Sequence, residues 1–474
     1  MGDEQAARSE IGMVGLGVMG RNLLLNMAEH GFPVAGYDKD ASQLEALRRE
    51  SGELDIRGVQ DIGELVGLLR RPRAVMVLVP AGSPVDAVIR DLLSFLLPGD
   101  LIIDGGNSHF TDSNLRARTL AERGIQFLAV GVSGGEHGAR HGPSMMPGGA
   151  AQAYERVRPV FEAISAKVDG QPCVTWLGPG SAGHYVKMVH NGIEYALMQL
   201  IAETYDIMKR GLGLTDDELG DVYDDWNRSE LSSYLMEITV QIFQRVEEKT
   251  GTRLIDLILD EAGQKGTGMW MSQDAMDLQV PIPTIDAAVT MRNISAGRSD
   301  REAYSRIFVR EIRRFAGSRN AFLTRTRNAL FAATILAYAQ GMAQLWKASL
   351  SYTYALNLEE VARIWRGGCI IRAAVLEQVR AAFRAKPGLS NLLQNAALGD
   401  AVMRRQEDLR AVVCTAVESG LAVPALAASL GYFDAYRSEW LPASLVQAQR
   451  DYFGAHTYER IDARGTFHTL WEKE

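Results

Sequence analysis

Cysteine is scarce in this sequence, and long apolar segments are missing. The three cysteines, Cys173, Cys369 and Cys414, are odd in number and lack the spacing of metal ligands. They indicate a reducing, cytoplasmic setting and predict neither a disulfide nor a metal site. No apolar run reaches the length of about 18 residues that a membrane helix needs. The best candidate, residues 329–339, is therefore predicted to be a buried helix.

An export signal and an excess of basic charge are also missing. The first ten residues are polar and acidic, unlike a signal peptide, and Ala6 stands where a myristoylation motif has Ser or Thr. With 50 Lys and Arg against 58 Asp and Glu, the formal net charge is −8. This balance argues against nucleic acid or an anionic membrane as a partner. It does not exclude an anionic small molecule, because a pocket can be basic within an acidic protein.

The length and the pattern of apolar residues indicate more than one domain. At 474 residues the chain exceeds a single ordinary core. Between residues 10 and 135, short apolar runs alternate with amphipathic stretches, which predicts βαβ units and a mostly parallel, doubly wound sheet. The five runs cover residues 11–15, 34–37, 74–79, 101–104 and 126–132.

After residue 180 the pattern becomes helical. Residues 182–209 contain no proline and have apolar residues at helical spacing, so they predict one helix of about 28 residues. We predict an α/β Rossmann-like domain over residues 1–180 and a large all-α domain over residues 181–439. Residues 440–474 form a C-terminal tail whose many aromatic residues predict that it docks against a protein surface.

A glycine motif of the form GxGxxG follows the first predicted strand and opens a helix. In this context it predicts a dinucleotide site, with the pyrophosphate at the helix N-terminus. Gly15 permits the tight turn, Gly17 lets the backbone approach the phosphates, and Gly20 allows close helix packing. The alternative is a tight turn that binds no ligand. The motif is Gly15-Leu16-Gly17-Val18-Met19-Gly20.

The end of the second predicted strand bears on the choice of cofactor. A carboxylate at Asp38 would accept hydrogen bonds from the ribose hydroxyls of NAD and repel the 2′-phosphate of NADP. Asp40 adds a second negative charge, whereas Lys39 is a single cation. The pattern favours NAD over NADP. The alternatives are a solvated turn without a ligand, or a Lys39 that neutralises the phosphate.

Five polar residues share one face of the helix predicted after residue 181. Buried without a ligand, such a set would cost several kcal/mol, so a functional face is favoured over the alternative of a solvated one. A base and an acid two turns apart lie about 10 Å apart along the axis, which leaves room for one small substrate. The residues are Lys187, His190, Asn191, Glu194 and Tyr195.

Three polar loops supply candidate partners for this helix. Asn107 follows a strand at the sheet edge where doubly wound proteins bind ligands, and Ser133-Gly134-Gly135 follows the next strand. The glycines there expose N–H groups suited to a carboxylate. Lys265 lies in a glycine-rich turn that is either part of the site or an ordinary surface loop.

The chain resembles the decarboxylating 6-phosphogluconate dehydrogenases of the oxidative pentose phosphate pathway over nearly its whole length. The resemblance rests on five separated strings in the same order. They are Gly131-Val132-Ser133-Gly134-Gly135-Glu136, residues 187–195, Asp260-Glu261-Ala262 with Lys265-Gly266-Thr267-Gly268, Tyr338-Ala339-Gln340-Gly341, and residues 449–458.

The resemblance implies oxidation of 6-phosphogluconate to ribulose 5-phosphate and carbon dioxide, with NAD or NADP as the cofactor and no metal. It implies that Lys187 is the general base, neutral through burial and nearby cations, and that Glu194 is the general acid. It implies a homodimer, in which the tail reaches the partner's site. Asn107, Ser133-Gly134-Gly135, His190 and Asn191 would hold the sugar acid, and Tyr195, Lys265, Arg292, Arg450 and His456 the phosphate.

The departures from the family concern the cofactor. Many NADP-using members have Asn-Arg-Thr where this chain has Asp38-Lys39-Asp40, a lysine in place of Pro80, and often alanine in place of Gly17. These differences favour NAD. Besides the glycine motif, the implied cofactor residues are Asp38, Lys39, Asp40, Val79, Pro80, Ala81 and Asn107.

Two other functions share some of these sequence features. A non-decarboxylating β-hydroxyacid dehydrogenase shares the nucleotide domain and the catalytic lysine, but such enzymes are shorter and need no phosphate-binding tail. Arg450 and His456 therefore favour the decarboxylating enzyme. A nucleotide-sensing protein without catalysis is the second alternative, and the intact pair Lys187 and Glu194 argues against it.

Overall fold

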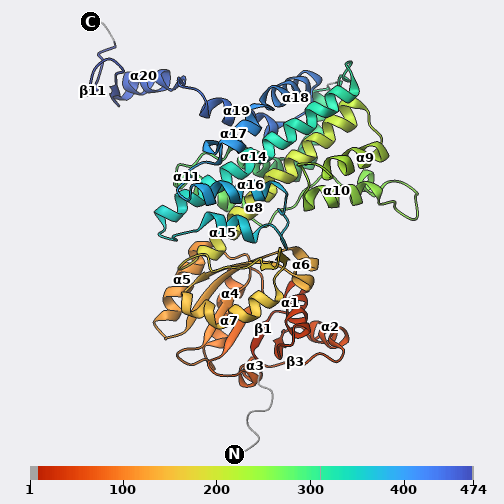
Figure 1. The fold of residues 1–474 in the computed structure, drawn as a ribbon, viewed down its shortest axis with the longest axis vertical. Helices are drawn as coiled ribbons and strands as arrows, with labels where there is room; N and C mark the ends of the chain where they lie inside the picture. Colours follow the sequence, from red (N-terminus) through yellow and green to blue (C-terminus); the bar gives the residue numbers. More distant parts are fainter. Residues whose placement is uncertain (1–8, 310, 472–474) are drawn as a thin grey trace, which may run out of the picture.

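The computed structural model describes residues 9–309 and 311–471. The expectation about an export signal therefore falls largely on residues outside the described part. Figure 1 shows an α/β body formed by the N-terminal part of the chain, a helical body beyond it, and a C-terminal tail that projects from the helical body. Within the described ranges, no helix combines the length and apolar character needed to cross a membrane.

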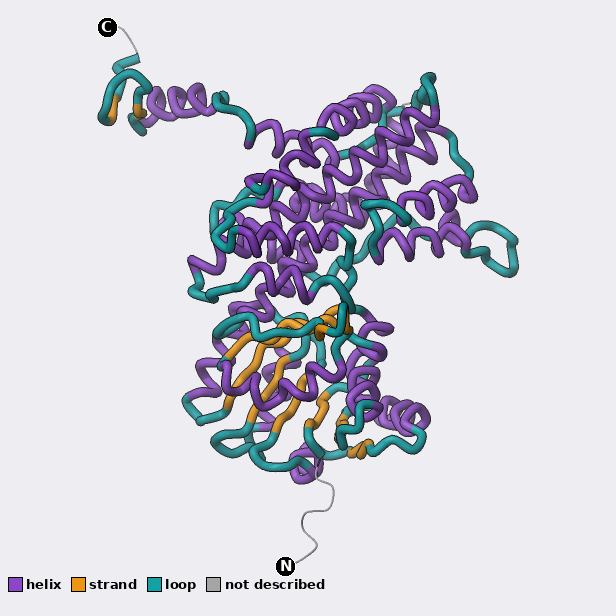
Figure 2. The backbone as a smooth tube through the Cα atoms, viewed as in Figure 1, coloured by secondary structure: helices purple, strands orange, loops and turns teal. Residues whose placement is uncertain are grey.

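A seven-stranded sheet lies at the centre of the N-terminal body (Figure 2). The strands from β1 to β6 pair in parallel in the order β3-β2-β1-β4-β5-β6, and β7 lies antiparallel to β6 at the edge. The prediction of a mostly parallel sheet is confirmed. The strands are β1 Ile11–Val14, β2 Val34–Tyr37, β3 Ile56–Val59, β4 Ala74–Val77, β5 Leu101–Asp104, β6 Gln126–Ser133 and β7 Ser144–Gly149.

Helices cover both faces of this sheet. One apolar core contains residues of α1 and α7, and the core on the opposite face contains residues of α3, α4 and α5. This confirms the doubly wound arrangement. The helices are α1 Val18–Glu29, α2 Ala41–Ser51, α3 Ile62–Leu68, α4 Ser83–Leu92, α5 Phe110–Ala121, α6 Gly135–His141 and α7 Ala151–Ile164, followed by the hairpin of β8 Lys167–Val168 and β9 Gln171–Pro172.

The helix predicted from residue 182 is α8, Ala182–Asp206. It ends three residues earlier than predicted and continues as a π-helical turn over Ile207–Leu212. Its first turn packs directly on β6 and β7, because a Cβ atom on Gly183 would overlap the carbonyl oxygens of Ala129 and Met146. Glycine at this crossing brings the polar face of α8 to the end of the sheet.

The helical body is built around α8 and the long helix α14, Arg319–Ser351, which pack against each other. Residues 329–339 lie buried within α14 apart from Thr334, which confirms the predicted buried helix. The remaining elements are α9 Asp216–Asn227, α10 Tyr234–Gln244, α11 Thr267–Asp277, α12 Pro283–Ala296, α13 Arg298–Ile307, α15 Leu358–Ile364, α16 Val375–Ala385, α17 Ala396–Met403, α18 Gln406–Ser419 and α19 Pro424–Tyr436, with 3-10 turns at Leu254–Leu257 and Leu392–Gln394.

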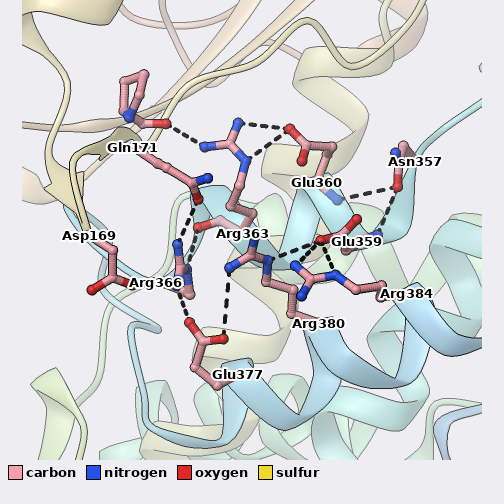
Figure 3. Close-up of polar contacts among 11 residues, drawn as sticks. Asp169, Gln171, Asn357, Glu359, Glu360, Arg363, Arg366, Glu377, Arg380 and Arg384 are labelled. Carbon is pink, nitrogen blue, oxygen red and sulfur yellow. Dashed lines mark hydrogen bonds and ion pairs between the residues drawn. The ribbon is translucent and has the colours of Figure 1, made fainter.

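Arginines and carboxylates join the two bodies (Figure 3). Arg363 of α15 donates to the carbonyl oxygens of Pro172 at 2.6 Å and Val174 at 3.2 Å. Arg366, just after α15, pairs with Asp169 at 3.2 Å and also with Glu377 of α16. These contacts attach the β8–β9 hairpin, which ends the N-terminal body, to the first helices after α14.

The tail forms a small unit of its own. It consists of α20 Ala443–Gly454 and the hairpin of β10 Tyr458–Glu459 and β11 Thr466–Phe467. Asp451 holds it together, because its carboxylate accepts hydrogen bonds from Thr457 N, His468 Nδ1, Thr469 N and Trp471 Nε1 at 2.9–3.0 Å. Figure 1 shows the tail projecting from the rest of its chain, so its docking stays a prediction about a partner subunit.

Candidate active site

The glycine motif has the geometry of a dinucleotide-binding turn. Gly15 has φ +96°, and a Cβ atom on Gly20 would overlap the carbonyl oxygen of Gly15. Gly17 is the N-cap of α1, and no side chain caps this helix end. Nothing lies within 4 Å of a Cβ built on Gly17. The open space and the uncapped N–H groups of α1 fit a bound pyrophosphate.

Asp38 is fixed against the glycine turn. Its carboxylate accepts hydrogen bonds from the backbone N–H of Leu16 at 2.7 Å and of Asp40 at 2.9 Å. Asp40 caps α2 by accepting from Ser42 N at 2.9 Å, and hydrogen bonds from the side chain and the backbone of Ser42 lower the pKa of Asp40. Lys39 is exposed. Both carboxylates therefore have structural partners, which the sequence pattern did not indicate.

The loops after β4 and β5 lie side by side at one sheet edge, because these strands are parallel neighbours. The first loop contains the predicted cofactor residues Val79, Pro80 and Ala81, and the second contains Asn107, which is exposed. Ser133 is the last residue of β6, the neighbour of β5, and β6 packs against α8.

The polar face of α8 forms a connected cluster. Lys187 Nζ lies 3.4 Å from His190 Nδ1, which lies 3.1 Å from Asn191 Oδ1 and 3.8 Å from Glu194 Oε2. Ser133 Oγ lies 3.1 Å from His190 Nε2. The structure therefore brings together four predicted residues of α8 and the Ser133 loop.

His190 is neutral in this cluster. It is fully buried, and burial together with the Lys187 amine lowers the pKa of His190 well below its ordinary value. The Asn191 oxygen is an acceptor, so Nδ1 carries the imidazole proton and Nε2 accepts from the Ser133 hydroxyl. His190 thereby fixes the orientation of Ser133 relative to Lys187.

The pKa values of Lys187 and Glu194 are shifted in opposite directions, and each shift favours the neutral form of the side chain. Burial lowers the pKa of Lys187, while Glu194 and Cys369 raise it to a smaller extent. Burial also raises the pKa of Glu194, and Lys187 and Arg292 offset this only in part. Burial alone thus favours a neutral lysine, and the expected contribution of cationic neighbours was wrong. An amine of lowered pKa beside a carboxyl of raised pKa has the composition of a base–acid pair.

Two of the five predicted phosphate residues, Tyr195 and Arg292, lie together, and the loop that carries Lys265 contacts them. The Arg292 guanidinium stacks over the Tyr195 ring at 4.9 Å and donates to Gly263 O in the Lys265 loop at 3.3 Å. Gly268 permits close contact with the Tyr195 ring, since a Cβ there would lie 2.7 Å from it. Of the other two predicted residues, Arg450 lies in α20 and His456 follows it, both in the projecting tail (Figure 1).

The segment after α15 forms a wall of the site that the sequence patterns did not indicate. Trp365 is fully buried and packs edge-on to His190 with ring centroids 5.7 Å apart. Gly368 has φ +65°, and its carbonyl oxygen would lie 2.6 Å from a Cβ on Gly134. Cys369 is near enough to Lys187 to affect its pKa. In the sequence, the pair of glycines shortly after Trp365 is the feature that could have indicated this wall.

Comparison with known protein families gives one match for each of the two parts of this chain. The family model described as the NAD binding domain of 6-phosphogluconate dehydrogenase matches residues 10–178, and the 6-phosphogluconate dehydrogenase C-terminal domain matches residues 183–471. This chain belongs to the 6-phosphogluconate dehydrogenase family. It is a decarboxylating, NAD(P)-dependent member.

Relatives match the chain from end to end. The decarboxylating 6-phosphogluconate dehydrogenase of Synechococcus elongatus is 51% identical over 98% of this chain and 100% of its own length. The NADP(+)-dependent decarboxylating enzyme of Bacillus subtilis is 49% identical with the same coverage. A Plasmodium falciparum 6-phosphogluconate dehydrogenase, solved in apo form and with NADP+ or 6-phosphogluconate, matches with TM-score 0.94 and 43% identity over 97% of this chain and 100% of that one.

Proposed function

We propose that Lys187 and Glu194 are the base and the acid with which this chain converts 6-phosphogluconate to ribulose 5-phosphate and carbon dioxide. The observation that carries the proposal is a buried amine of lowered pKa and a carboxyl of raised pKa on one face of α8, beside a dinucleotide-binding turn. An initial-rate assay of 6-phosphogluconate with NAD and with NADP, following carbon dioxide release, tests it.

The order of steps follows from the protonation states. Neutral Lys187 would take the proton of the substrate C3 hydroxyl, and the dinucleotide held at the glycine turn would supply the acceptor for the C3 hydride. The resulting 3-keto acid loses carbon dioxide, because the electron pair of the breaking bond is delocalised onto the keto oxygen. Lys187, now an ammonium, donates a hydrogen bond to that oxygen. That oxygen takes the proton of Lys187 to give the five-carbon enediol, and as Glu194 protonates C1 the hydroxyl proton returns to Lys187, which leaves the ketone.

The pH profile tests the role of Glu194. The acid must be protonated, so the wild-type kcat/KM is expected to fall as pH rises through the raised pKa of Glu194. The base must be deprotonated, so kcat/KM should also rise with pH as Lys187 loses its proton through its lowered pKa. Glu194→Gln should lose most turnover, and its residual rate should rise with pH to a plateau without the alkaline fall. An alkaline fall that persists in Glu194→Gln would assign it to another group.

We propose that NAD is the preferred cofactor. Two backbone amides hold the Asp38 carboxylate, so it cannot swing away from an incoming 2′-phosphate. The Asp40 carboxylate lies beside it, and Lys39 is one flexible cation without the planar fork of arginine. This preference would distinguish the chain from the relative named NADP(+)-dependent.

The cofactor proposal gives a measurable ratio. The kcat/KM with NAD should exceed that with NADP by at least about tenfold, equivalent to about 1.4 kcal/mol. Asp38→Asn combined with Asp40→Thr should shift the ratio toward NADP. Asp40→Thr alone is the matched control, because threonine still caps α2. Equal use of both cofactors would mean that Lys39 neutralises the phosphate, and a strong NADP preference would refute the role given to Asp38.

We propose further that the protein acts as a homodimer in which Arg450 and His456 complete the partner's phosphate pocket. The tail exposes large apolar side chains, with Trp440, Leu445 and Phe453 at 65%, 64% and 73% exposure. Leu257, Ile258 and Leu259, which precede the Lys265 loop, are also exposed. Apolar surfaces of this kind favour association. The pocket of one chain holds Lys265, Arg292 and Tyr195, and the tail supplies two further groups suited to a phosphate.

A further inference from the structure

Arg116 of α5 is a buried arginine at the base of the cofactor loops. It is 6% exposed. Nε donates to Asp86 Oδ1 at 2.7 Å, and Nη2 donates to the Gly82 carbonyl oxygen at 3.1 Å. Nη1 donates to Ser108 Oγ at 3.1 Å and to Asp104 Oδ2 at 3.3 Å. The fork of the guanidinium is thus divided between two segments that are not adjacent in sequence.

These two segments carry the predicted cofactor residues. Gly82 directly follows Val79–Ala81, and Asp86 lies in the first turn of α4. Asp104 and Ser108 flank Asn107, and the fully buried Asp104 carboxylate also accepts from Gly106 N at 3.1 Å and Ser108 Oγ at 2.7 Å. Arg116 therefore fixes the loop after β4 relative to the loop after β5.

The same network reaches the catalytic helix. His184 lies one helical turn before Lys187, and its Nε2 lies 3.0 Å from the carbonyl oxygen of Asp104. That oxygen can only accept, so Nε2 carries the proton, and Nδ1 lies 2.7 Å from Ser113 Oγ, which also contacts His109 O at 3.1 Å. Burial lowers the pKa of His184, in agreement with this neutral form. The last residue of β5 is thus bonded to both Arg116 and the start of α8.

We propose that Arg116 and His184 are positioning residues that hold the cofactor loops in register with Lys187. Neither side chain is placed to touch the reacting atoms, and both act through the loops that they bind. Arginine is required at this place because a lysine ammonium cannot donate along the several fixed directions of the fork. The inference rests on the proposed function, since the register matters only if hydride passes from substrate to cofactor beside Lys187.

Kinetics of Arg116→Met, compared with Arg118→Met, test the proposal. Arg118 lies on the same helix and is exposed, so its substitution should leave the kinetics unchanged. Arg116→Met should raise the cofactor KM and lower kcat, each by about tenfold or more, since small displacements of reacting groups cost up to about a hundredfold. The KM for 6-phosphogluconate should change less than that of the cofactor. The deuterium isotope effect at C3 should increase, and added methylguanidine should restore part of the rate.

If Arg116→Met does not fold, a second variant tests the proposal. Asp86→Ala removes only the partner that is 55% exposed, and it should shift the cofactor KM and the isotope effect in the same direction by a smaller factor. Folded variants with the kinetics of Arg118→Met would overturn the proposal, as would a lowered melting temperature with unchanged kinetics. A wild type that does not oxidise 6-phosphogluconate would refute the proposed function instead. Fluorescence titration with NADH and NADPH would then test the cofactor contribution of Arg116 separately.

Discussion

Lys187→Met is expected to reduce the cofactor at less than about a hundredth of the wild-type rate. Methionine has nearly the length of lysine and fits a buried site, but it cannot accept the C3 hydroxyl proton. General base catalysis contributes about 10²–10⁴-fold, and the neighbouring His190 is already engaged with Asn191 and Ser133. The measurement is the absorbance of reduced cofactor at saturating substrate. A residual rate above about a hundredth would mean that another group is the base.

Stability measurements provide the control for this variant. Burial lowers the pKa of Lys187 in the folded chain, so the unfolded chain binds the proton more strongly. The wild type should therefore gain stability as pH rises toward the ordinary pKa of lysine. Lys187→Met should lack this gain and be at least as stable at neutral pH. A variant that is inactive but equally stable separates loss of the base from loss of the fold.

Mixing Lys187→Met with Arg450→Ala is expected to restore activity that neither chain has alone. If the tail acts in the partner's site, each mixed dimer has one site with both Lys187 and Arg450 intact. Random exchange of equal amounts makes half of the dimers mixed, so about a quarter of all sites should recover. The measurement is the rate of 6-phosphogluconate oxidation after subunit exchange, which labelled chains verify independently.

Arg460→Ala is the matched control for the tail. Arg460 lies on the same tail and pairs with Asp462, outside the residues assigned to phosphate. This variant should be active by itself and should restore little when mixed with Arg450→Ala beyond its own activity. Verified exchange between Lys187→Met and Arg450→Ala without recovered activity would show that each tail serves its own subunit.

Much of the fold followed from local pattern, and the exceptions have physical causes. The five continuous apolar runs became strands because buried parallel strands are apolar on both faces. β3 was not predicted, since its sequence Ile-Arg-Gly-Val is only partly buried at the sheet edge. β7 was not predicted because Pro147, Gly148 and Gly149 argue against a strand. Gly148 is needed there for close packing against the start of α8, which is a tertiary requirement.

In the active site too, local sequence patterns predicted some residues, whereas residues brought in by tertiary packing could not be predicted. The residues of α8 could be grouped from helical spacing alone, and the structure joins Lys187, His190 and Asn191 through short contacts. The wall formed by Trp365 and Gly368 could not be inferred, because it lies far from α8 in sequence and is placed by helix packing. The structural partners of Asp38 were missed for the same reason, since one of them is the amide of Leu16.

The Asp451 cluster has a consequence for the proposed docking of the tail on a partner subunit. Although burial raises it, hydrogen bonds from His468, Thr469, Trp471 and Thr457 lower the pKa of Asp451 to about 2, so its charge persists throughout the physiological range. The carboxylate thereby ties the helix and hairpin of the tail into one shape before any partner is met. These residues lose their conformational entropy when the chain folds. Docking of the tail would therefore cost only the translational and rotational entropy of joining two rigid bodies, without the further cost of ordering the tail.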